Sequence, residues 1–227
     1  YDNNNVRNKT KFKANRTAEI VIDEHNFHAK DVDVDISATN GKGESVSISD
    51  YESYLQNSEN WKKSGDKYTA KITYTAEANY HFQIKYTDLA GIKNNGVTYG
   101  KNTQAPEIFT IDKTKPTGAI KIGDWEEKWT GFPSAKEDNR SFGLWDKKTV
   151  QVTVASQDEL SAIDYVEHFR SDRILSLNQV KQSNQWKKAA LDRTGAFSYH
   201  VKPDERFVVY VHIVDKAGNE RYLSSDG

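Results

Sequence analysis

Short runs in which apolar and polar residues alternate constrain this fold more than any other feature. Every second residue of a strand lies on the same face, so each run predicts a strand with one buried and one solvated face. The apolar members of the first four runs are Ala18, Ile20 and Ile22; Val32, Val34, Ile36 and Ala38; Tyr68, Ala70, Ile72 and Tyr74; and Tyr80, Phe82, Ile84 and Tyr86. Several short strands separated by turn signals predict a β-sandwich.

The same organisation returns in the second half of the chain. Val150, Val152 and Val154 alternate with polar residues, and Phe207, Val209, Val211 and Ile213 form a last inward-facing set. Two short motifs also recur at nearly constant offsets. Trp61-Lys62-Lys63 returns as Trp186-Lys187-Lys188 at an offset of 125 (186 − 61), and Asp88-Leu89-Ala90-Gly91 returns as Asp215-Lys216-Ala217-Gly218 at an offset of 127 (215 − 88). Such offsets indicate a repeated module.

Residues 109–117 join the two copies. Phe109 and Ile111 alternate with polar residues as in a closing strand, and Pro116 favours extended geometry at Lys115. A chain of 227 residues suits two units of roughly 110 residues, each large enough to bury a core. We therefore predict two domains, residues 1–113 and 114–227, with an aromatic-rich insert at 123–146 in the second.

Composition excludes several classes of protein. The chain has 32 Lys and Arg against 33 Asp and Glu and no basic run, which argues against a nucleic-acid partner. Its apolar runs are all far too short to insert into a membrane. The absence of Cys excludes disulfides, thiolate metal sites and a Cys nucleophile, but leaves the compartment open. The absence of an initiating Met leads us to expect a piece of a longer protein.

Four residues have expected structural roles. Trp61 is the natural centre of the first core, and Tyr80 stands where the tyrosine corner of an immunoglobulin-like sandwich would stand. In the second copy, Asp215 can accept backbone N–H bonds across the turn, for which Gly218 supplies a positive φ.

Several motifs resemble the tandem bacterial Ig-like domains of Gram-positive cell-surface proteins. In the first half these are residues 15–22 running into Glu24-His25-Asn26-Phe27, the turn Thr87-Asp88-Leu89-Ala90-Gly91, and the joint Ile111-Asp112-Lys113-Thr114-Lys115-Pro116. The second half resembles a sister type through Ser141-Phe142-Gly143-Leu144-Trp145, Asp158-Glu159-Leu160-Ser161-Ala162-Ile163, and Val214-Asp215-Lys216-Ala217-Gly218-Asn219. Ala162 departs from the family pattern, which has Gly there.

The resemblance implies an all-β fold made of two immunoglobulin-like β-sandwich domains in tandem. It implies a monomeric, non-catalytic spacer or adhesive segment on the extracellular bacterial cell surface, next to further Ig-like modules of the same chain. Two alternatives stay open: a dedicated binder of a host extracellular protein or glycan, acting through the aromatic insert or a sheet edge, and accessory domains of a secreted carbohydrate-active enzyme. Fold resemblance alone does not identify a ligand.

The aromatic insert holds the candidate ligand-binding residues Trp125, Trp129, Phe132 and Trp145. Exposed aromatic rings can stack on sugars or anchor a protein partner. The competing interpretation is that they cap one end of the second sandwich. Residues 124–129 could form a helical turn that places Trp125 and Trp129 on one side.

Polar clusters predict neither a metal nor another cofactor. Asp31, Asp33 and Asp35 alternate as on a solvated strand face, where side chains are too far apart to converge on calcium. Asp88, Asp112 and Asp215, near the module ends, are weak calcium candidates. His25 and His28 could share zinc with Glu24, but no second ligand cluster follows. His81, His200 and His212 are expected to face solvent.

No pattern in the sequence predicts catalysis. There is no Gly-x-Ser-x-Gly elbow and no phosphate-binding Gly-rich loop. A Lys–Asn isopeptide crosslink, known from some wall-anchored Ig-like domains, would need a buried Lys, an Asn and a carboxylate on adjacent strands, and the sequence does not single out such a trio.

Overall fold

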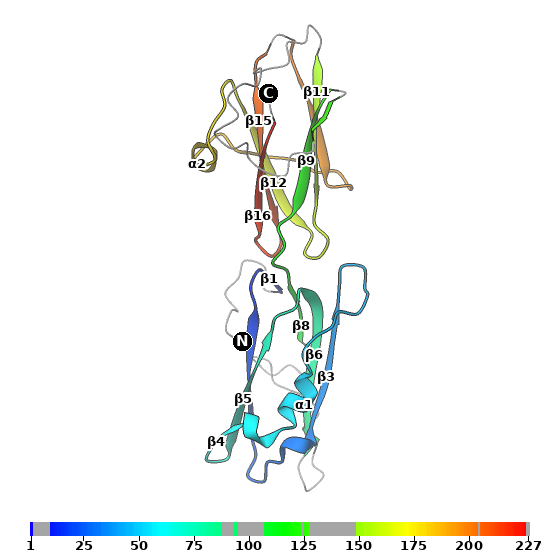
Figure 1. Ribbon diagram of the computed structural model, residues 1–227, viewed down its shortest axis with the longest axis vertical. Coiled ribbons are helices and arrows are strands. Elements are labelled where there is room, and N and C mark those ends of the chain that lie inside the picture. The colour runs from blue at the N-terminus through cyan, green and yellow to red at the C-terminus, as the bar shows by residue number, and fades with distance from the viewer. Residues whose placement is uncertain are drawn as a thin grey trace. The chain divides into compact units, whose positions relative to one another are not determined.

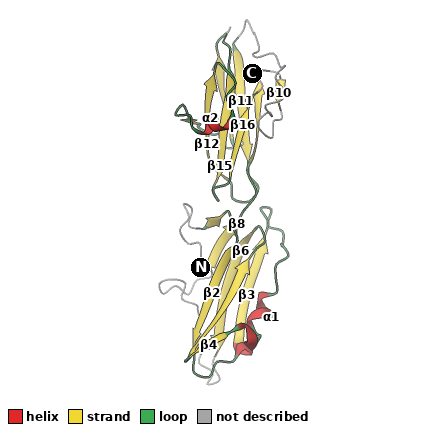
Figure 2. Cartoon of the chain, turned by 60° about the vertical axis from the view of Figure 1, so that its left-hand side comes forward, coloured by secondary structure: helices red, strands yellow, loops and turns green. Residues whose placement is uncertain are grey.

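The chain is an all-β protein that folds into two compact units, Tyr1–Lys113 and Thr114–Gly227. A computed structural model describes residues 1, 10–87, 93–94, 107–123, 125–127, 149–203 and 205–225. Figures 1 and 2 show two sheets in each unit. Among the described residues, no helix is long and apolar enough to cross a membrane.

Unit 1 is built from two sheets. The first has the order β1–β8–β6–β3, with β7 also on β6; its strands are β1 (Lys11–Phe12), β3 (Val32–Thr39), β6 (Ala78–Thr87), β7 (Lys93–Asn94) and β8 (Glu107–Ile111). The second has the order β2–β5–β4; its strands are β2 (Arg16–Asp23), β4 (Lys62–Ser64) and β5 (Lys67–Tyr74). The β1–β8 pair is parallel and the other pairs of unit 1 are antiparallel.

The described part of unit 1 also contains three short helices: η1 (Ala29–Asp31), α1 (Tyr51–Leu55) and η2 (Ser58–Asn60). The Asp50 carboxylate caps α1 by accepting the backbone N–H of Ser53 at 3.0 Å. The cap fixes the start of α1, and Leu55 at the end of this helix is fully buried in the core.

The core of unit 1 follows the predicted alternation. Ala18, Ile20, Val32, Ile72 and Phe82 are all buried in one cluster. Trp61 lies in that core with 7% of its surface exposed, as predicted, and its Nε1–H donates to the Leu55 carbonyl at 2.7 Å. The Tyr80 hydroxyl donates to the Ala76 carbonyl at 3.0 Å, which is the contact that a tyrosine corner makes.

Unit 2 also has two sheets. One has the order β10–β9–β11–β14, formed by β9 (Thr117–Ile122), β10 (Trp125–Glu127), β11 (Val150–Gln157) and β14 (Ala196–Val201). The other has the order β13–β12–β15–β16, formed by β12 (Ile163–Ser171), β13 (Lys187–Lys188), β15 (Val208–Asp215) and β16 (Glu220–Ser224). Helix α2 (Leu177–Lys181) lies between β12 and β13. The helical turn expected near Trp125 is wrong, because residues 125–127 pair with β9 as a strand.

The turn before β12 holds Ala162 in a left-handed conformation, which a glycine would adopt more easily. The Asp158 carboxylate accepts the backbone N–H groups of Ser161 at 2.7 Å and Ala162 at 2.8 Å. Ala162 has a φ of 66°, and among the described residues no other non-glycine residue has a positive φ. The turn needs a left-handed residue, which costs an alanine about 1 to 2 kcal/mol.

The recurring Trp-Lys-Lys motif has a different environment in each unit. In unit 1 the short strand after Trp61 pairs with β5, so the tryptophan lies inside the sandwich. In unit 2 the short strand after Trp186 pairs with β12, in the other sheet. Trp186 therefore packs on the outer face, beside Phe169 and Tyr210.

Candidate functional site

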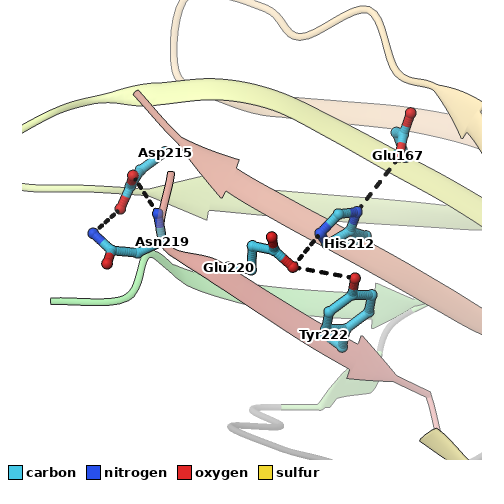
Figure 3. Close-up of polar contacts among 6 residues, drawn as sticks. All are labelled: Glu167, His212, Asp215, Asn219, Glu220 and Tyr222. Atoms are coloured by element: carbon cyan, nitrogen blue, oxygen red, sulfur yellow. Dashed lines mark hydrogen bonds and ion pairs between the residues drawn. The ribbon is translucent and has the colours of Figure 1, made fainter. Parts of the chain in front are cut away.

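One polar cluster of unit 2 is centred on His212 of β15. His212 lies opposite Glu167 of β12 and opposite Tyr222 of β16 in the two antiparallel ladders. Residues opposite each other in a sheet present their side chains on the same face. The imidazole therefore has an acidic neighbour on each side: Nδ1 is 3.4 Å from Glu167 Oε2, and Nε2 is 3.4 Å from Glu220 Oε2 (Figure 3).

Aromatic rings enclose this imidazole. It stacks on Tyr222, with ring centroids 4.2 Å apart and planes inclined by 5°, and Trp186 and Tyr165 lie at 5.7 and 5.9 Å. His212 retains 8% of its surface exposed. Burial, together with the Glu220 carboxylate, raises the pKa of Tyr222 to about 12. At neutral pH Tyr222 is thus a phenol, and its hydroxyl donates to Glu220 Oε2 at 3.3 Å.

Two lysines lie over the outer rings of the cluster. Lys181 Nζ is 5.3 Å from the centroid of the Tyr222 ring, and Lys188 Nζ is 5.6 Å from that of Tyr165. An ammonium group at this distance is attracted by the negative face of the ring. Two of the protein's own cations therefore lie near the rings of this cluster.

The connection from β12 to β13 packs on the same face of the sheet and covers part of it. Ser176 and Gln179 form a capping box that starts α2, and Val180 of this helix is fully buried. The backbone N–H of Leu175 donates to the Tyr210 hydroxyl at 2.7 Å. As a result, all eight residues of β15 are buried, although one face of β15 lies outside the sandwich core.

The chemistry of the cluster fits a structural role. Its two carboxylates contact opposite nitrogens of the imidazole, so they do not converge on one side of the ring as metal ligands would. A general acid or base must reach its substrate within hydrogen-bond distance, and His212 is buried. The observed contacts link β12, β15 and β16 across one sheet face.

A second polar cluster is the turn from β15 to β16. One carboxylate oxygen of Asp215 accepts the backbone N–H groups of Gly218 at 2.7 Å and Asn219 at 2.9 Å. The other accepts the Asn219 side-chain amide at 2.8 Å (Figure 3). Gly218 has a φ of 90°, so both predicted features of this turn are confirmed. Burial raises the pKa of Asp215, the bonds from Asn219 and Gly218 oppose this shift, and Asp158 adds to it.

Asp31, Asp33 and Asp35 do not all lie on one strand. Asp33 and Asp35 are exposed on β3 as expected, whereas Asp31 belongs to η1. Asp88 lies outside the described residues. Asp112 is buried directly after β8, where its backbone N–H donates to the Phe12 carbonyl at 2.9 Å.

The two neighbouring histidines of unit 1 have separate partners. His25 Nδ1 is 2.9 Å from an oxygen of Asp66, and His28 Nδ1 is 3.3 Å from an oxygen of Asp31. The structure therefore does not bring His25 and His28 to a common zinc position with Glu24.

One Lys–Asn contact resembles part of an isopeptide arrangement but lies in solvent. Lys113 Nζ is 3.3 Å from Asn15 Oδ1, and both residues are exposed. A crosslink of this kind needs a buried lysine that can lose its proton, because burial disfavours the charged ammonium. This pair lacks that burial.

The aromatic ligand-binding candidates are largely untested. The backbone of Trp125 lies in β10 opposite Ile122. Trp129, Phe132 and Trp145 lie outside the described residues. Their role in binding stays a prediction.

The expectation that His212 faces solvent is wrong, whereas His200 is exposed as expected. A readable signal existed, because residues 207–214 form an apolar run interrupted only at His212. Such a run indicates a strand that is buried on both faces, and alternation then no longer identifies a solvent-facing position. The partners Glu167 and Glu220 were not identifiable, because they depend on strand pairing.

No model of a known protein family matches this chain, and no curated protein is significantly similar to it.

Proposed function

We propose that this chain is a pair of immunoglobulin-like modules of a bacterial cell-surface protein, where it acts as a non-catalytic spacer and adhesive segment. The observation that carries the proposal is that each unit has a hydrophobic core of its own. The core of unit 1 is formed by residues between Phe12 and Ile111, and the cores of unit 2 by residues between Ile120 and Leu223. A unit with its own core can be repeated and strung together without a shared pocket.

Details of the sandwiches support the immunoglobulin-like assignment. Unit 1 has two sheets of short strands, a parallel pairing of its first and last strands, and the Tyr80–Ala76 hydrogen bond. In unit 2 the Asp215 turn leads from β15 into β16, and residues 214–219 are one of the segments that carry the sequence resemblance. The extracellular, cell-surface location rests on the same resemblance.

A non-catalytic role is supported by the polar clusters of the described residues. The buried His212 uses its two nitrogens against carboxylates of neighbouring strands, and Asp215 uses both oxygens to hold a turn. These groups are engaged in holding the fold rather than aligned around a reacting atom.

The spacer function is tested by separating the units. Residues 1–113 and residues 114–227 are produced as two polypeptides, and their thermal unfolding is compared with that of the whole chain. We expect each to unfold cooperatively, with the two midpoints reproducing those of the whole chain. Failure of either polypeptide to fold would overturn the independent-module proposal.

The adhesive function is tested by binding. The chain is applied to an array of host extracellular proteins and glycans, beside a variant with Trp125→Ala and Trp129→Ala. Ile108→Ala is the matched control, because Ile108 is a large apolar residue that is 63% exposed in unit 1. We expect one class of ligand to be lost with the tryptophan variant alone. No binding by the folded chain would overturn the adhesive part and leave the spacer part standing.

A further inference from the structure

One core position has a different chemical character in the two units. In unit 1, Val34 of β3 lies opposite Ile84, four residues before the first Asp-x-Ala-Gly motif. In unit 2, His168 of β12 lies opposite Val211, four residues before the second copy of that motif. Val34 is buried in the core of unit 1. Unit 2 therefore carries a titratable side chain where unit 1 carries an aliphatic one.

His168 lies on the inner face of its sheet. Side chains two residues apart on a strand share a face, and Val166 is fully buried in the core. The centroid of the His168 ring is 4.7 Å from that of Phe197 and 5.1 Å from that of Tyr199. Both of these rings belong to β14, which pairs with β11 in the other sheet. The imidazole therefore connects the two sheets of unit 2 through β14.

Two cations lie near His168. Lys187 of β13 is opposite it in the antiparallel ladder, and Arg170 follows two residues later on β12. The Glu205 carboxylate, which follows β14, pairs with Arg170 at 2.7 Å. Tyr199 adds no negative charge at neutral pH, because burial raises its pKa to about 12. The residue of β15 opposite the histidine is a valine. These surroundings disfavour a protonated imidazole.

The titration of His168 follows from this environment. Burial lowers the pKa of His168, and the charges of Lys187 and Arg170 lower it further. Its Nδ1 atom is buried and has no hydrogen-bond partner among the described residues, whereas a protonated ring donates from both nitrogens. The stability that the neutral ring contributes is present above the unfolded pKa of about 6.5 and is lost as pH falls through the folded pKa.

We propose that His168 is an acid-sensitive contact between β12 and β14: when its imidazole takes up a proton, β14 loosens from unit 2 before the rest of the unit unfolds. The protonated ring must reach water at Nδ1, and it does so by separating from Phe197 and Tyr199. Unit 1 has no matching response at Val34, because a valine does not titrate. The inference goes beyond the spacer and adhesive roles and does not depend on the cellular location.

Hydrogen exchange of backbone amides tests this contact, because it reports local opening strand by strand. The whole chain is exchanged at several values between about pH 7.5 and about pH 5.5, and the rates are corrected for the intrinsic pH dependence of exchange. We expect the protection of β14 to fall as pH falls, by up to about tenfold per pH unit, because one proton is taken up on opening. Strand β5 of unit 1 is the internal reference.

Variants assign the response to one side chain. His168→Phe keeps a ring against Phe197 and Tyr199 but cannot be protonated, so the protection of β14 should stay constant relative to unit 1. His200→Gln is the matched control, because His200 is an exposed histidine of β14, and it should respond as the wild type does. His168→Val, which copies Val34, replaces the first variant if the larger ring disturbs the fold. An unchanged pH response without His168, or equal loss of protection in all strands of unit 2, would overturn the proposal.

Nuclear magnetic resonance of the His168 ring gives a test on the wild-type chain alone. The chemical shifts of the ring follow its protonation directly. We expect half-protonation at a pH below the ordinary histidine value of about 6.5. Half-protonation at or above this value would overturn the proposal, because the aromatic rings of β14 would then favour the charged form.

Discussion

His212 and Tyr222 lie opposite each other on β15 and β16, and their rings are almost parallel at a centroid distance of 4.2 Å. Because β16 is the last strand of its sheet among the described residues, this stack covers His212 on the side where no further strand follows. The pair therefore contributes both packing and the attachment of an edge strand.

We expect Tyr222→Leu to destabilise unit 2 by about 1 to 2 kcal/mol, because it removes the ring stack along with apolar contact area. Tyr222→Phe keeps the ring, so its free energy of unfolding should lie within about 0.5 kcal/mol of the wild type. Urea unfolding followed by tryptophan fluorescence measures both. Equal losses in the two variants would show that the hydroxyl bond to Glu220, and not the stack, stabilises this edge.

The pH dependence of stability should have opposite signs at two aspartates of unit 2. Burial raises the pKa of Asp215, so the stability it contributes is present below the unfolded pKa of about 3.9 and is lost as pH rises through the folded pKa. The hydrogen bond from Thr194 lowers the pKa of Asp192, so its contribution is present above that value and is lost as pH falls through the folded pKa.

Between pH 3 and pH 7, the free energy of unfolding of Asp215→Asn should therefore rise relative to the wild type. That of Asp192→Asn should fall over the same range. Urea unfolding at several pH values measures both differences. Slopes of the same sign would contradict the assignment of burial as the dominant cause at Asp215.

Alanine substitutions at two glycines of unit 2 separate the effect of close packing on stability from the effect of backbone conformation. Gly195 and Gly123 both have a positive φ, 80° and 59°. A Cβ atom at Gly195 would lie 2.5 Å from the Ser156 carbonyl oxygen, whereas at Gly123 the nearest atom would be Val150 Cγ1 at 3.7 Å. Both alanine variants lose about 1 kcal/mol for the left-handed backbone, and Gly195→Ala should lose about 1 to 3 kcal/mol more. Equal shifts of the thermal unfolding midpoint in the two variants would contradict a steric overlap between a Cβ atom at residue 195 and the Ser156 carbonyl oxygen.

Tyr80→Phe should destabilise unit 1 by about 1 kcal/mol near neutral pH, since it removes the hydrogen bond to the Ala76 carbonyl. Burial raises the pKa of Tyr80 to about 12. The stability from this shift is present below the unfolded pKa of about 10 and is lost as pH rises through the folded pKa. The variant should therefore lose less stability than the wild type between pH 9 and pH 12, as measured by urea unfolding. A parallel loss in both proteins would assign the alkaline transition to other residues.

The strands of unit 1 could be predicted because alternation and burial coincide there. Ile20, Ile72 and Phe82 stand on one-sided strands, so the apolar period of two identifies the core directly. The role of Asp215 could also be predicted. In a turn, Asp commonly accepts backbone N–H groups a few residues further on and Gly supplies a positive φ, as Asp215 and Gly218 do here.

The sheet that β13 joins could not be predicted. Trp61 and Trp186 head the same three-residue motif, yet the pairing of the next strand places one ring inside a sandwich and the other on an outer face. Pairing depends on contacts between residues far apart in sequence. For the same reason, Glu167 and Tyr222 lie on two other strands, β12 and β16, and could not be identified as neighbours of His212 from its own segment.

The parallel pairing of β1 with β8 determines how unit 1 resists being stretched. Phe12 lies opposite Ile111, the Thr110 N–H donates to the Thr10 carbonyl at 2.8 Å, and the Asp112 N–H donates to the Phe12 carbonyl at 2.9 Å. Tension along the polypeptide pulls these two parallel segments in opposite directions, so both hydrogen bonds are sheared together instead of opening one after the other. The rate of forced unfolding, and not the equilibrium stability, then limits the load that the unit carries.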